Sequence, residues 1–392
     1  MRRSACVIAL ILALTTTAAP LFFGPDGSAA SAGSSRRVLG HYVSNDPASW
    51  ASLQAQAHLI DVVAAQWVTV DPCGQLGSSD DQTLKAFAHS RGIQVLPSLV
   101  TFSGWLNHRI LTDDEISASV ISQIVDYVVE EGYDGFDLDL EGVWPEDRAA
   151  YTAFVVRLGA TLHERDKLLA LALPAKTSDT RTGWGGAFDY AALGPHADLL
   201  TIMAYEYSGS WGDPGPIAPY NWVEGVTAFA TSQIPPEKVL LGLAFYGHDW
   251  NTTSPGETRY VGYPQAAALS ERYEVPIVLD PTTRSETIRY RAPGGEPPPR
   301  AAALPALRNQ ITQRQPPPCS VTQPPTPTPI RRPTPVPGVM QDHVVWLEAS
   351  ESAAARLPLA DRYRTGGMAA WRLGHEDPST WTVVERWRRG EP

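Results

Sequence analysis

Three carboxylic acids alternate with apolar residues in the segment 133–142, which reads YDGFDLDLEG. Successive side chains of a β-strand point to opposite faces, so Asp137, Asp139 and Glu141 share one face and the intervening Phe and Leu side chains share the other. Burying three ionised carboxylates in one row is costly, and their mutual repulsion raises at least one pKa. The row therefore predicts a carboxyl group that keeps its proton near neutral pH, as general acid catalysis requires.

Glu141 is the last acid of the row, at the carboxyl end of the predicted strand. Active sites of parallel α/β barrels open at this end of the strands. We therefore expect Glu141 to be a general acid whose protonated state is supported by Asp139 beneath it. Two other interpretations are a solvated acidic strand and a magnesium or calcium site. The strict alternation with Phe and Leu disfavours the first, and the row needs no second set of ligands, which weakens the second.

The elements that must position this row are short apolar runs separated by helical patterns. Eight runs are predicted strands: 38–43, 59–70, 94–100, 135–140, 168–173, 199–205, 239–246 and 368–373. Most are apolar on both faces, as parallel strands covered by helices are. We predict a (β/α)8 barrel of the α/β class over residues 37–392. An open doubly wound sheet is the alternative, but no Gly-rich phosphate loop follows the first run.

Residues 250–345 lack this alternation of apolar runs and helical patterns, and residues 293–337 are rich in proline. We predict a small α+β insertion between the seventh and eighth strands, carrying a Pro-rich loop of extended, solvated chain. The alternative is a linker between two domains. The run 368–373 disfavours it, because that run looks like the last strand of the barrel.

The N-terminus has the order of a secretory signal peptide, predicted here as residues 1–32. Arg2 and Arg3 precede an apolar stretch and then small residues, so cleavage after Ala19 or Ala32 is expected. A membrane anchor is the alternative, but the apolar run is short for a bilayer. We therefore expect a secreted or cell-wall-associated protein without membrane insertion. Its remaining cysteines, Cys73 and Cys319, are either a disulfide or two free thiols.

Composition limits the partners and cofactors. A hydrophobic content of 43% over 392 residues predicts a folded protein with a sizeable core. The formal charge of −11 disfavours nucleic acid and anionic membrane surfaces as partners. The nine histidines show no zinc-type spacing, so we assign no metal ligand and no cofactor. We expect a monomer.

Residues 134–141, DGFDLDLE, resemble the signature of glycoside hydrolase family 18, which includes chitinases and cortex-type peptidoglycan hydrolases. The resemblance extends from about residue 37 to residue 381. The segments AFYGHDW at 244–250 and GMAAWRLGHED at 367–377 look like the seventh and eighth strands of the branch related to spore-germination N-acetylglucosaminidases. The insertion between them is also similar to that branch.

The resemblance implies a retaining mechanism assisted by the substrate, an exception to the scheme with two catalytic carboxylates. Glu141 would protonate the leaving oxygen while the N-acetyl carbonyl of the substrate attacks the anomeric carbon. Asp139 would orient the acetamido group, and Asp137 would hold Asp139. Tyr205 matches the family tyrosine that bonds the acetamido oxygen, and Trp371 would form the floor beneath the distorted sugar.

One position departs from the family pattern. Glu206 follows Tyr205 where the family usually has Asp, which puts its placement against the sugar in doubt. We expect Glu206 and the nearby Met203 to contact substrate. For Tyr205 and Trp371, ordinary barrel packing is the alternative. Four more tryptophans are either glycan platforms or loop anchors: Trp105, Trp144, Trp211 and Trp222.

The expected activity is hydrolysis of a β-1,4-linked polymer that contains N-acetylglucosamine, with peptidoglycan favoured over chitin by the branch resemblance. A rival hypothesis is a lectin-like glycan-binding protein on the same barrel. The retained Glu141, Asp139 and Tyr205 disfavour it, whereas Glu206 leaves room for it. A third hypothesis makes the Pro-rich loop the contact surface for a wall-remodelling partner.

Overall fold

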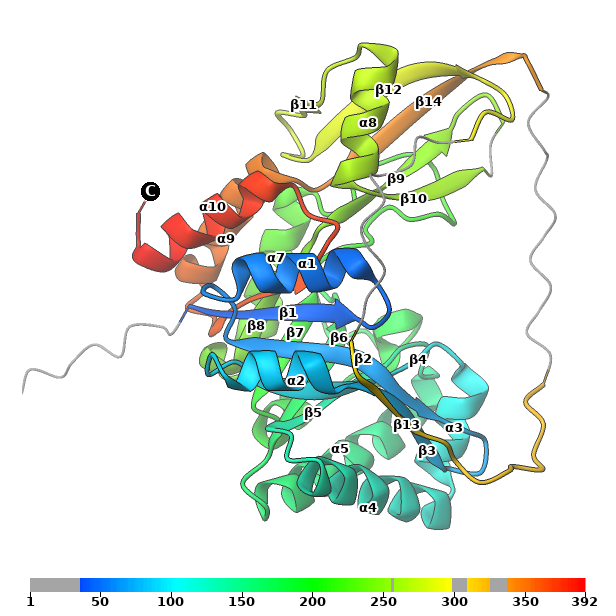
Figure 1. The fold of residues 1–392 in the computed structure, drawn as a ribbon, viewed down its shortest axis with the longest axis vertical. Coiled ribbons are helices and arrows are strands. Elements are labelled where there is room, and N and C mark those ends of the chain that lie inside the picture. Colours follow the sequence, from blue (N-terminus) through cyan, green and yellow to red (C-terminus); the bar gives the residue numbers. More distant parts are fainter. Residues whose placement is uncertain (1–35, 255–256, 298–308, 325–336, 392) are drawn as a thin grey trace, which may run out of the picture. The chain divides into compact units, whose positions relative to one another are not determined.

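Two sheets organise the chain in the computed structural model, which describes residues 36–254, 257–297, 309–324 and 337–391 (Figure 1). These residues belong to one unit that spans 34–392. The signal peptide predicted at residues 1–32 lies outside the described residues. One sheet has ten strands and contains a closed parallel barrel; the other has five antiparallel strands.

The barrel consists of eight parallel strands, and β1 pairs with both β2 and β15 to close it. The strands are β1 (Arg37–Val43), β2 (Val62–Val70), β4 (Gln94–Thr101), β5 (Gly135–Leu140), β6 (Leu168–Pro174), β7 (Leu199–Met203), β8 (Val239–Ala244) and β15 (Gly367–Trp371). The predicted (β/α)8 barrel is thus confirmed. The predicted run 239–246 is interrupted at Phe245, where the chain leaves the barrel and begins the second sheet at Tyr246.

Helices follow the strands and cover the outside of the barrel (Figure 1). They are α1 (Pro47–Gln56), α2 (Gln82–His89), α3 (Gly104–Thr112), α4 (Asp114–Glu130), α5 (Arg148–His163), α6 (Tyr190–Leu193), α7 (Tyr220–Gln233), α9 (Ser350–Arg362) and α10 (Pro378–Arg389). In α4, Asp113 accepts the N–H of Ile116 and so satisfies an amide that the first turn leaves unpaired. Each helix buries an apolar face against the outer side of the strands.

Strand β5 shows how the alternation of residue types sets the two sides of the barrel wall. Phe136, Leu138 and Leu140 are buried in the large cluster between strands and helices. The interior of the barrel is filled by a separate, smaller cluster, to which Leu39, Ala170 and other strand residues contribute. Asp137 and Asp139 alternate with the outward residues, so they face the interior.

The second sheet is formed between β8 and α9, in the strand order β10-β9-β14-β12-β11. Its strands are β9 (Tyr246–Asn251), β10 (Thr258–Gly262), β11 (Val278–Leu279), β12 (Glu286–Pro293) and β14 (Met340–Leu347). Helix α8 (Tyr263–Tyr273) packs on it through Ala266 and Leu269. The predicted insertion covers 250–345, whereas this sheet begins at Tyr246 and ends with Leu347.

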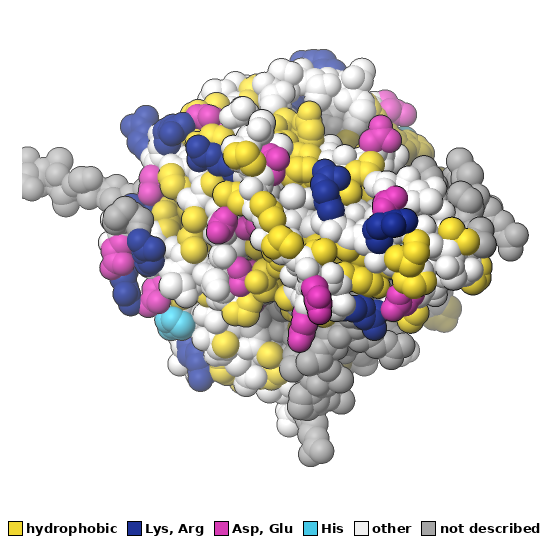
Figure 2. Space-filling model, turned by 90° about the horizontal axis from the view of Figure 1, so that it is seen from above, with side chains coloured by type: hydrophobic (Ala, Val, Ile, Leu, Met, Phe, Trp, Pro, Cys, Tyr) yellow, Lys and Arg dark blue, Asp and Glu magenta, His cyan; other side chains and the backbone are white. Residues whose placement is uncertain are grey.

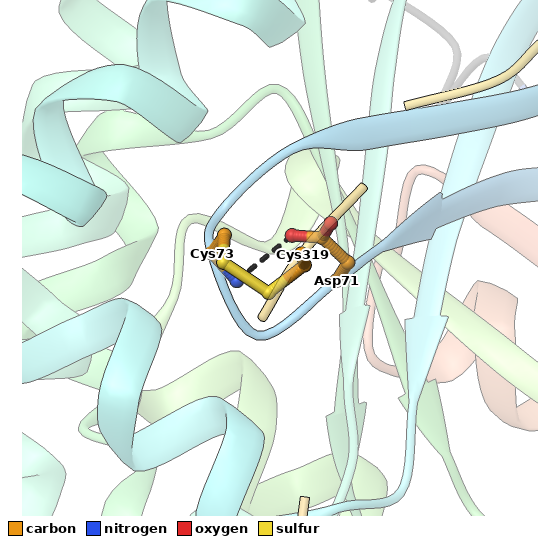
Figure 3. A group of neighbouring side chains, drawn as sticks. All are labelled: Asp71, Cys73 and Cys319. Atoms are coloured by element: carbon orange, nitrogen blue, oxygen red, sulfur yellow. Dashed lines mark hydrogen bonds between the residues drawn. A yellow bond between two sulfur atoms is a disulfide. The ribbon is translucent and has the colours of Figure 1, made fainter. Parts of the chain in front are cut away.

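Part of the Pro-rich segment is attached to the barrel. We call residues 309–324 the strap. Its strand β13 (Ile311–Arg314) is exposed and extended, and it pairs with β3 (Leu76–Asp81). Strand β3 in turn pairs antiparallel with the end of β2. Cys319 forms a disulfide with Cys73 in the β2–β3 loop, with the Cα atoms 5.8 Å apart (Figure 3). The structure therefore selects the disulfide from the two alternatives for these cysteines.

The face of the molecule in Figure 2 carries acidic and basic side chains interspersed with apolar ones. Within the described ranges, no helix combines the length and the apolar character that crossing a bilayer requires.

Candidate active site

A cavity of about 530 Å³ is lined by residues at the carboxyl ends of the barrel strands and by the loops that follow them. Its lining residues are His41, Phe102, Asp139, Glu141, Ala172, Pro174, Ala175, Trp184, Met203, Tyr205, Glu206, Trp211, Trp222, Tyr246, Tyr260 and Trp371. Six of the seven residues predicted for the site are among them. The seventh, Asp137, lies one pleat deeper in the barrel.

Asp137 is the buried base of the carboxyl row. Its side chain is almost completely buried, and the hydroxyl of Ser98 on β4 donates a 2.6 Å hydrogen bond to Oδ2. Burial raises the pKa of Asp137 to about 6, and the Ser98 hydrogen bond moderates this rise. Ser98 therefore holds the Asp137 carboxyl group in place. Because the pKa of Asp137 is raised, simultaneous ionisation of Asp137, Asp139 and Glu141 is disfavoured.

Asp139 and Glu141 share the cavity and have raised pKa values. Burial raises the pKa of Asp139 well above its usual range, and the charges of Glu141 and Asp137 raise it further. Burial also raises the pKa of Glu141 to about 7, with a further contribution from the charge of Glu206. Asp139 and Glu141 thus repel each other's charge, and Glu206 adds a third acid that favours the protonated Glu141. Asp139 Oδ1 has no hydrogen-bond partner within the described part of the chain.

The backbone of Glu141 is held on both sides. Its N–H donates to the carbonyl of Thr101 at 2.8 Å, and its own carbonyl accepts from Nδ2 of Asn107 at 2.7 Å. Gly142 follows with a φ of +71°, and a Cβ there would lie 2.9 Å from the carbonyl oxygen of Phe102. The chain therefore turns sharply directly after the acid, a turn that favours glycine.

Tyr205 and Met203 come from the end of β7, across the cavity from β5. Tyr205 is buried, and its pKa is raised well above its usual range by burial and then by the charges of Asp139, Glu141 and Glu206. Its hydroxyl therefore remains a hydrogen-bond donor at any physiological pH. Met203 is half-buried in the wall of the same cavity.

Glu206 is tied to the second sheet. Its carboxylate accepts a hydrogen bond from the hydroxyl of Tyr246 and lies 3.0 Å from Nε2 of His248. Its backbone has a φ of +61°, which is unusual for a residue other than glycine and costs conformational energy. The Glu206 side chain is one methylene longer than Asp, and its carboxylate contacts Tyr246 and His248 on β9.

Trp371 forms one wall of the cavity, and His41 contacts its edge. Their ring centroids are 5.3 Å apart in a T-shaped arrangement. The imidazole of His41 is buried, which lowers its pKa to about 4, so it is neutral at physiological pH. The indole of Trp371 lines the cavity, and a flat apolar ring of this kind can stack against the C–H groups of a sugar.

The rim of the cavity is aromatic. Phe102 is 69% exposed, Trp184 51% and Trp211 64%, although all three line the cavity. Of the four tryptophans left open by the sequence, Trp211 and Trp222 line it, whereas Trp105 and Trp144 do not.

The residues that sequence reasoning missed are His41, Phe102, Trp184, Tyr246 and Tyr260. The aromatic residues at positions 102 and 184 follow predicted strands, which is a weak indication of a rim position. Tyr246 and Tyr260 come from the second sheet, and the sequence carries no indication that this sheet contributes to the cavity.

The described residues contain one group of three potential metal ligands within 4.8 Å of one another, Asp71, Cys73 and Cys319. Its two sulfur atoms are joined in the disulfide, and Asp71 Oδ1 accepts the N–H of Cys73 (Figure 3). The same oxygen accepts the N–H of Gln75. A disulfide has no thiolate to offer a metal, so two of these three residues supply no ligand while they are oxidised.

Known proteins share the sequence and the fold. The chain is 24% identical to the "Uncharacterized glycosylase YvbX" of Bacillus subtilis (strain 168) over 388 residues, which are 97% of this chain and 98% of that protein. It is 26% identical to the "Cortical fragment-lytic enzyme" of the same organism over 287 residues, which cover 72% of this chain and 56% of that protein.

Two crystal structures share its fold with a TM-score of 0.71 at 24% identity. A chitinase from Chromobacterium violaceum ATCC 12472 covers 90% of this chain and 98% of its own. The spore cortex-lytic enzyme SleL from Bacillus megaterium QM B1551 covers 89% of this chain and 73% of its own. The family model "Glycosyl hydrolases family 18" matches residues 37–376. An acid with a raised pKa at the mouth of such a barrel agrees with this match, and the chain belongs to glycosyl hydrolase family 18.

Proposed function

We propose that this glycosidase is a secreted enzyme that cleaves β-1,4 bonds in a glycan containing N-acetylglucosamine, with retention of anomeric configuration. The observation that carries the proposal is the pair Asp139 and Glu141 in one aromatic-lined cavity. Both carboxyl groups have raised pKa values there, and Asp139 has a buried oxygen, Oδ1, without a partner in the described chain. Perturbed carboxyl groups in a cleft are the usual mark of an acid–base site.

The first step of the proposed mechanism is protonation of the glycosidic oxygen by Glu141. With a pKa of about 7, this group is protonated in about half of the molecules at neutral pH and can still accept a proton later. As the bond to the leaving sugar breaks, the acetamido carbonyl oxygen of the substrate bonds to the anomeric carbon. The product of this step is a cyclic oxazolinium ion, and Glu141 is left as a carboxylate.

Asp139 and Tyr205 orient the acetamido group in this proposal. The carboxyl group of Asp139, which lines the cavity, accepts the acetamido N–H and stabilises the positive charge that develops on the ring. The hydroxyl of Tyr205 donates to the acetamido oxygen and holds it below the anomeric carbon. Water then attacks this carbon from the side of Glu141, and the bond between the carbon and the acetamido oxygen breaks, which restores the acetamido group. Glu141 takes the proton of the water and returns to its starting state.

The aromatic rim supports binding of a long glycan. Phe102, Trp184 and Trp211 are exposed beside the catalytic pair, and flat apolar rings bind the C–H faces of sugars. We favour peptidoglycan over chitin because the relatives include cortical fragment-lytic enzymes. The disulfide between Cys73 and Cys319 supports an extracytoplasmic location, because disulfides persist in oxidising compartments.

Product analysis tests this function. Mass spectrometry of digests of purified peptidoglycan and of chitin oligomers should show products with a free N-acetylglucosamine reducing end. Proton NMR of fresh products should show the β anomer first, because the configuration is retained. An initial α anomer would contradict the substrate-assisted step, and binding of both glycans without any product would favour the lectin-like alternative.

A further inference from the structure

We propose that the strap is a positioning element for the catalytic acid: it holds helix α3, and α3 holds the backbone of Glu141. This inference rests on the proposed role of Glu141 as general acid. It assigns a function to the Pro-rich segment within the reaction itself. The contacts form a chain of three links.

The first link joins α3 to the acid. Asn107 on α3 is completely buried, and its Nδ2 donates a 2.7 Å hydrogen bond to the carbonyl of Glu141. The carbonyl of Thr101 on β4 accepts the N–H of Glu141. A shift of α3 would therefore move the carbonyl side of the Glu141 backbone while β4 holds the N–H side. The direction of the Glu141 carboxyl group into the cavity therefore depends on where α3 lies.

The second link joins the strap to the start of α3. Ser103 is the N-cap of this helix, and its Oγ accepts the N–H of Leu106 at 3.2 Å. The same Oγ accepts a 2.7 Å hydrogen bond from Nε2 of Gln323 on the strap. Ser103 follows Phe102, which lines the cavity, so the strap contacts the loop that borders the substrate.

The third link joins the last turns of α3 to the disulfide loop. Nε of Arg109 donates a 2.7 Å hydrogen bond to the carbonyl of Pro72, the residue before Cys73. Cys73 is bonded to Cys319, which lies four positions before Gln323 on the strap (Figure 3). The segment 319–323 thus runs from the loop beside one part of α3 to the N-cap at its start, and the disulfide fixes this segment covalently.

A positioning role has a kinetic signature that a merely structural role lacks. A general acid contributes most when the leaving group is a poor one, such as a sugar hydroxyl, and little when the leaving group is already acidic. Displacement of the Glu141 carboxyl group should therefore slow the cleavage of an N-acetylglucosamine oligomer. On the 2,4-dinitrophenyl glycoside of the same oligomer, the dinitrophenolate leaves without a proton, so kcat/KM should be nearly unchanged. This parameter reports the steps up to departure of the leaving group and excludes the later step in which Glu141 takes a proton from water.

The test compares two glutamines of the strap. Gln323→Ala removes the contact with Ser103, whereas Gln313→Ala removes a similar contact with Ser79 on β3, and both side chains are exposed. We expect Gln323→Ala to lower kcat/KM on the oligomer by roughly two- to tenfold, the worth of one hydrogen bond, and to lower it less than about twofold on the dinitrophenyl glycoside. Gln313→Ala should change neither rate. Equal behaviour of the two variants would overturn the proposal.

Two further variants sharpen the test. Asn107→Leu, which removes the direct contact, should lower kcat/KM on the oligomer by about tenfold or more, with the same preference for the activated substrate. Cys73→Ser with Cys319→Ser should resemble Gln323→Ala, measured on enzyme that circular dichroism shows to be folded. Where Asn107→Leu does not fold, the comparison of the two glutamines decides.

Glu141→Gln separates failure of this inference from failure of the proposed function. Loss of kcat/KM on the oligomer but not on the dinitrophenyl glycoside supports Glu141 as the acid, whatever the strap variants do. If Glu141→Gln shows that pattern and Gln323→Ala matches Gln313→Ala, the strap inference alone is wrong. If Glu141→Gln affects neither substrate, the proposed function is wrong as well.

Discussion

Two buried aspartates, Asp139 at the mouth of the barrel and Asp249 in the second sheet, differ in what surrounds them. Both are at least 97% buried, with exposures of 3% and 1%. Asp249 accepts a 2.7 Å hydrogen bond from the hydroxyl of Tyr290 on Oδ2, and Nδ1 of His343 lies 3.0 Å from Oδ1. Asp139 Oδ1 has no partner in the described residues, and two other acids stand beside it.

The comparison teaches that partners, and not burial, separate a structural acid from a reactive one. A buried carboxylate whose oxygens are both bonded stabilises the sheet that contains it. A buried carboxylate with an unpartnered oxygen costs folding free energy. Such an arrangement is expected where a ligand or a reaction uses that oxygen. Substitution of Asp139 should therefore lower activity more than stability, and substitution of Asp249 should lower stability more than activity.

The largest expected effect is that of Asp139→Asn on activity. The amide resembles the protonated acid in shape but cannot stabilise a positive charge, so kcat should fall by about a hundredfold or more. The melting temperature should stay the same or rise, because no charge remains to be buried. Steady-state kinetics and calorimetry on the same preparation check both parts, and a strongly destabilised Asp139→Asn would remove the contrast with Asp249.

Asp249→Ala should have the reverse profile. The hydroxyl of Tyr290 and the imidazole of His343 lose their acceptor inside the second sheet, which should lower the free energy of unfolding by roughly 2–4 kcal/mol. The kcat of the folded fraction should remain within about twofold of the parent. Urea unfolding followed by tryptophan fluorescence measures the first quantity. A stable Asp249→Ala enzyme with low kcat would assign Asp249 to the site.

Asp137→Asn should stabilise the fold at neutral pH. The folded pKa of Asp137 is about 6 against a usual 3.8, so ionisation costs stability as the pH rises through this interval, and the protonated form is the one that folding favours. Removing the charge should recover up to about 3 kcal/mol at pH near 7, and nothing at pH near 3. Denaturation at the two pH values measures this difference, and an equal effect at both would contradict the assigned pKa.

Glu206→Gln should have the smallest effect on rate at the optimum and a clear effect on pH dependence. The charge of Glu206 raises the pKa of Glu141, so its removal should move the alkaline limb of kcat/KM to lower pH by a fraction of a unit to about one unit. The neutral Gln still offers an oxygen to the hydroxyl of Tyr246. An unmoved limb would show that Glu206 acts on the sugar only.

How much of the site is readable from the sequence depends on how local each interaction is. The alternation of Asp137, Asp139 and Glu141 is a property of one strand, so their common face follows from the residue order alone. The barrel follows similarly from repeated apolar runs. The pairing of Glu206 with Tyr246 depends on contacts between segments 40 positions apart, and no short pattern encodes it.

The second sheet and the strap show the same limit. Tyr260 on β10 lines the cavity because the second sheet packs beside the barrel. The hydrophobic periodicity of the sequence does not predict this packing. Cys73 and Cys319 are separated by 246 positions, so their distance was undetermined until the fold was known. The proline content of the segment predicts extended, exposed chain, but it does not predict the strand β3 with which the strap pairs.

The pH dependence of kcat/KM on an N-acetylglucosamine oligomer, measured for the parent enzyme and for Glu141→Gln, tests the central claim most directly. Glu141 must be protonated to begin the reaction, so the parent rate should fall as the pH rises above about 7. In Glu141→Gln the remaining rate should be at least about a hundredfold lower and should lack this alkaline limb. The same limb in Glu141→Gln, at a similar rate, would show that another group carries the proton.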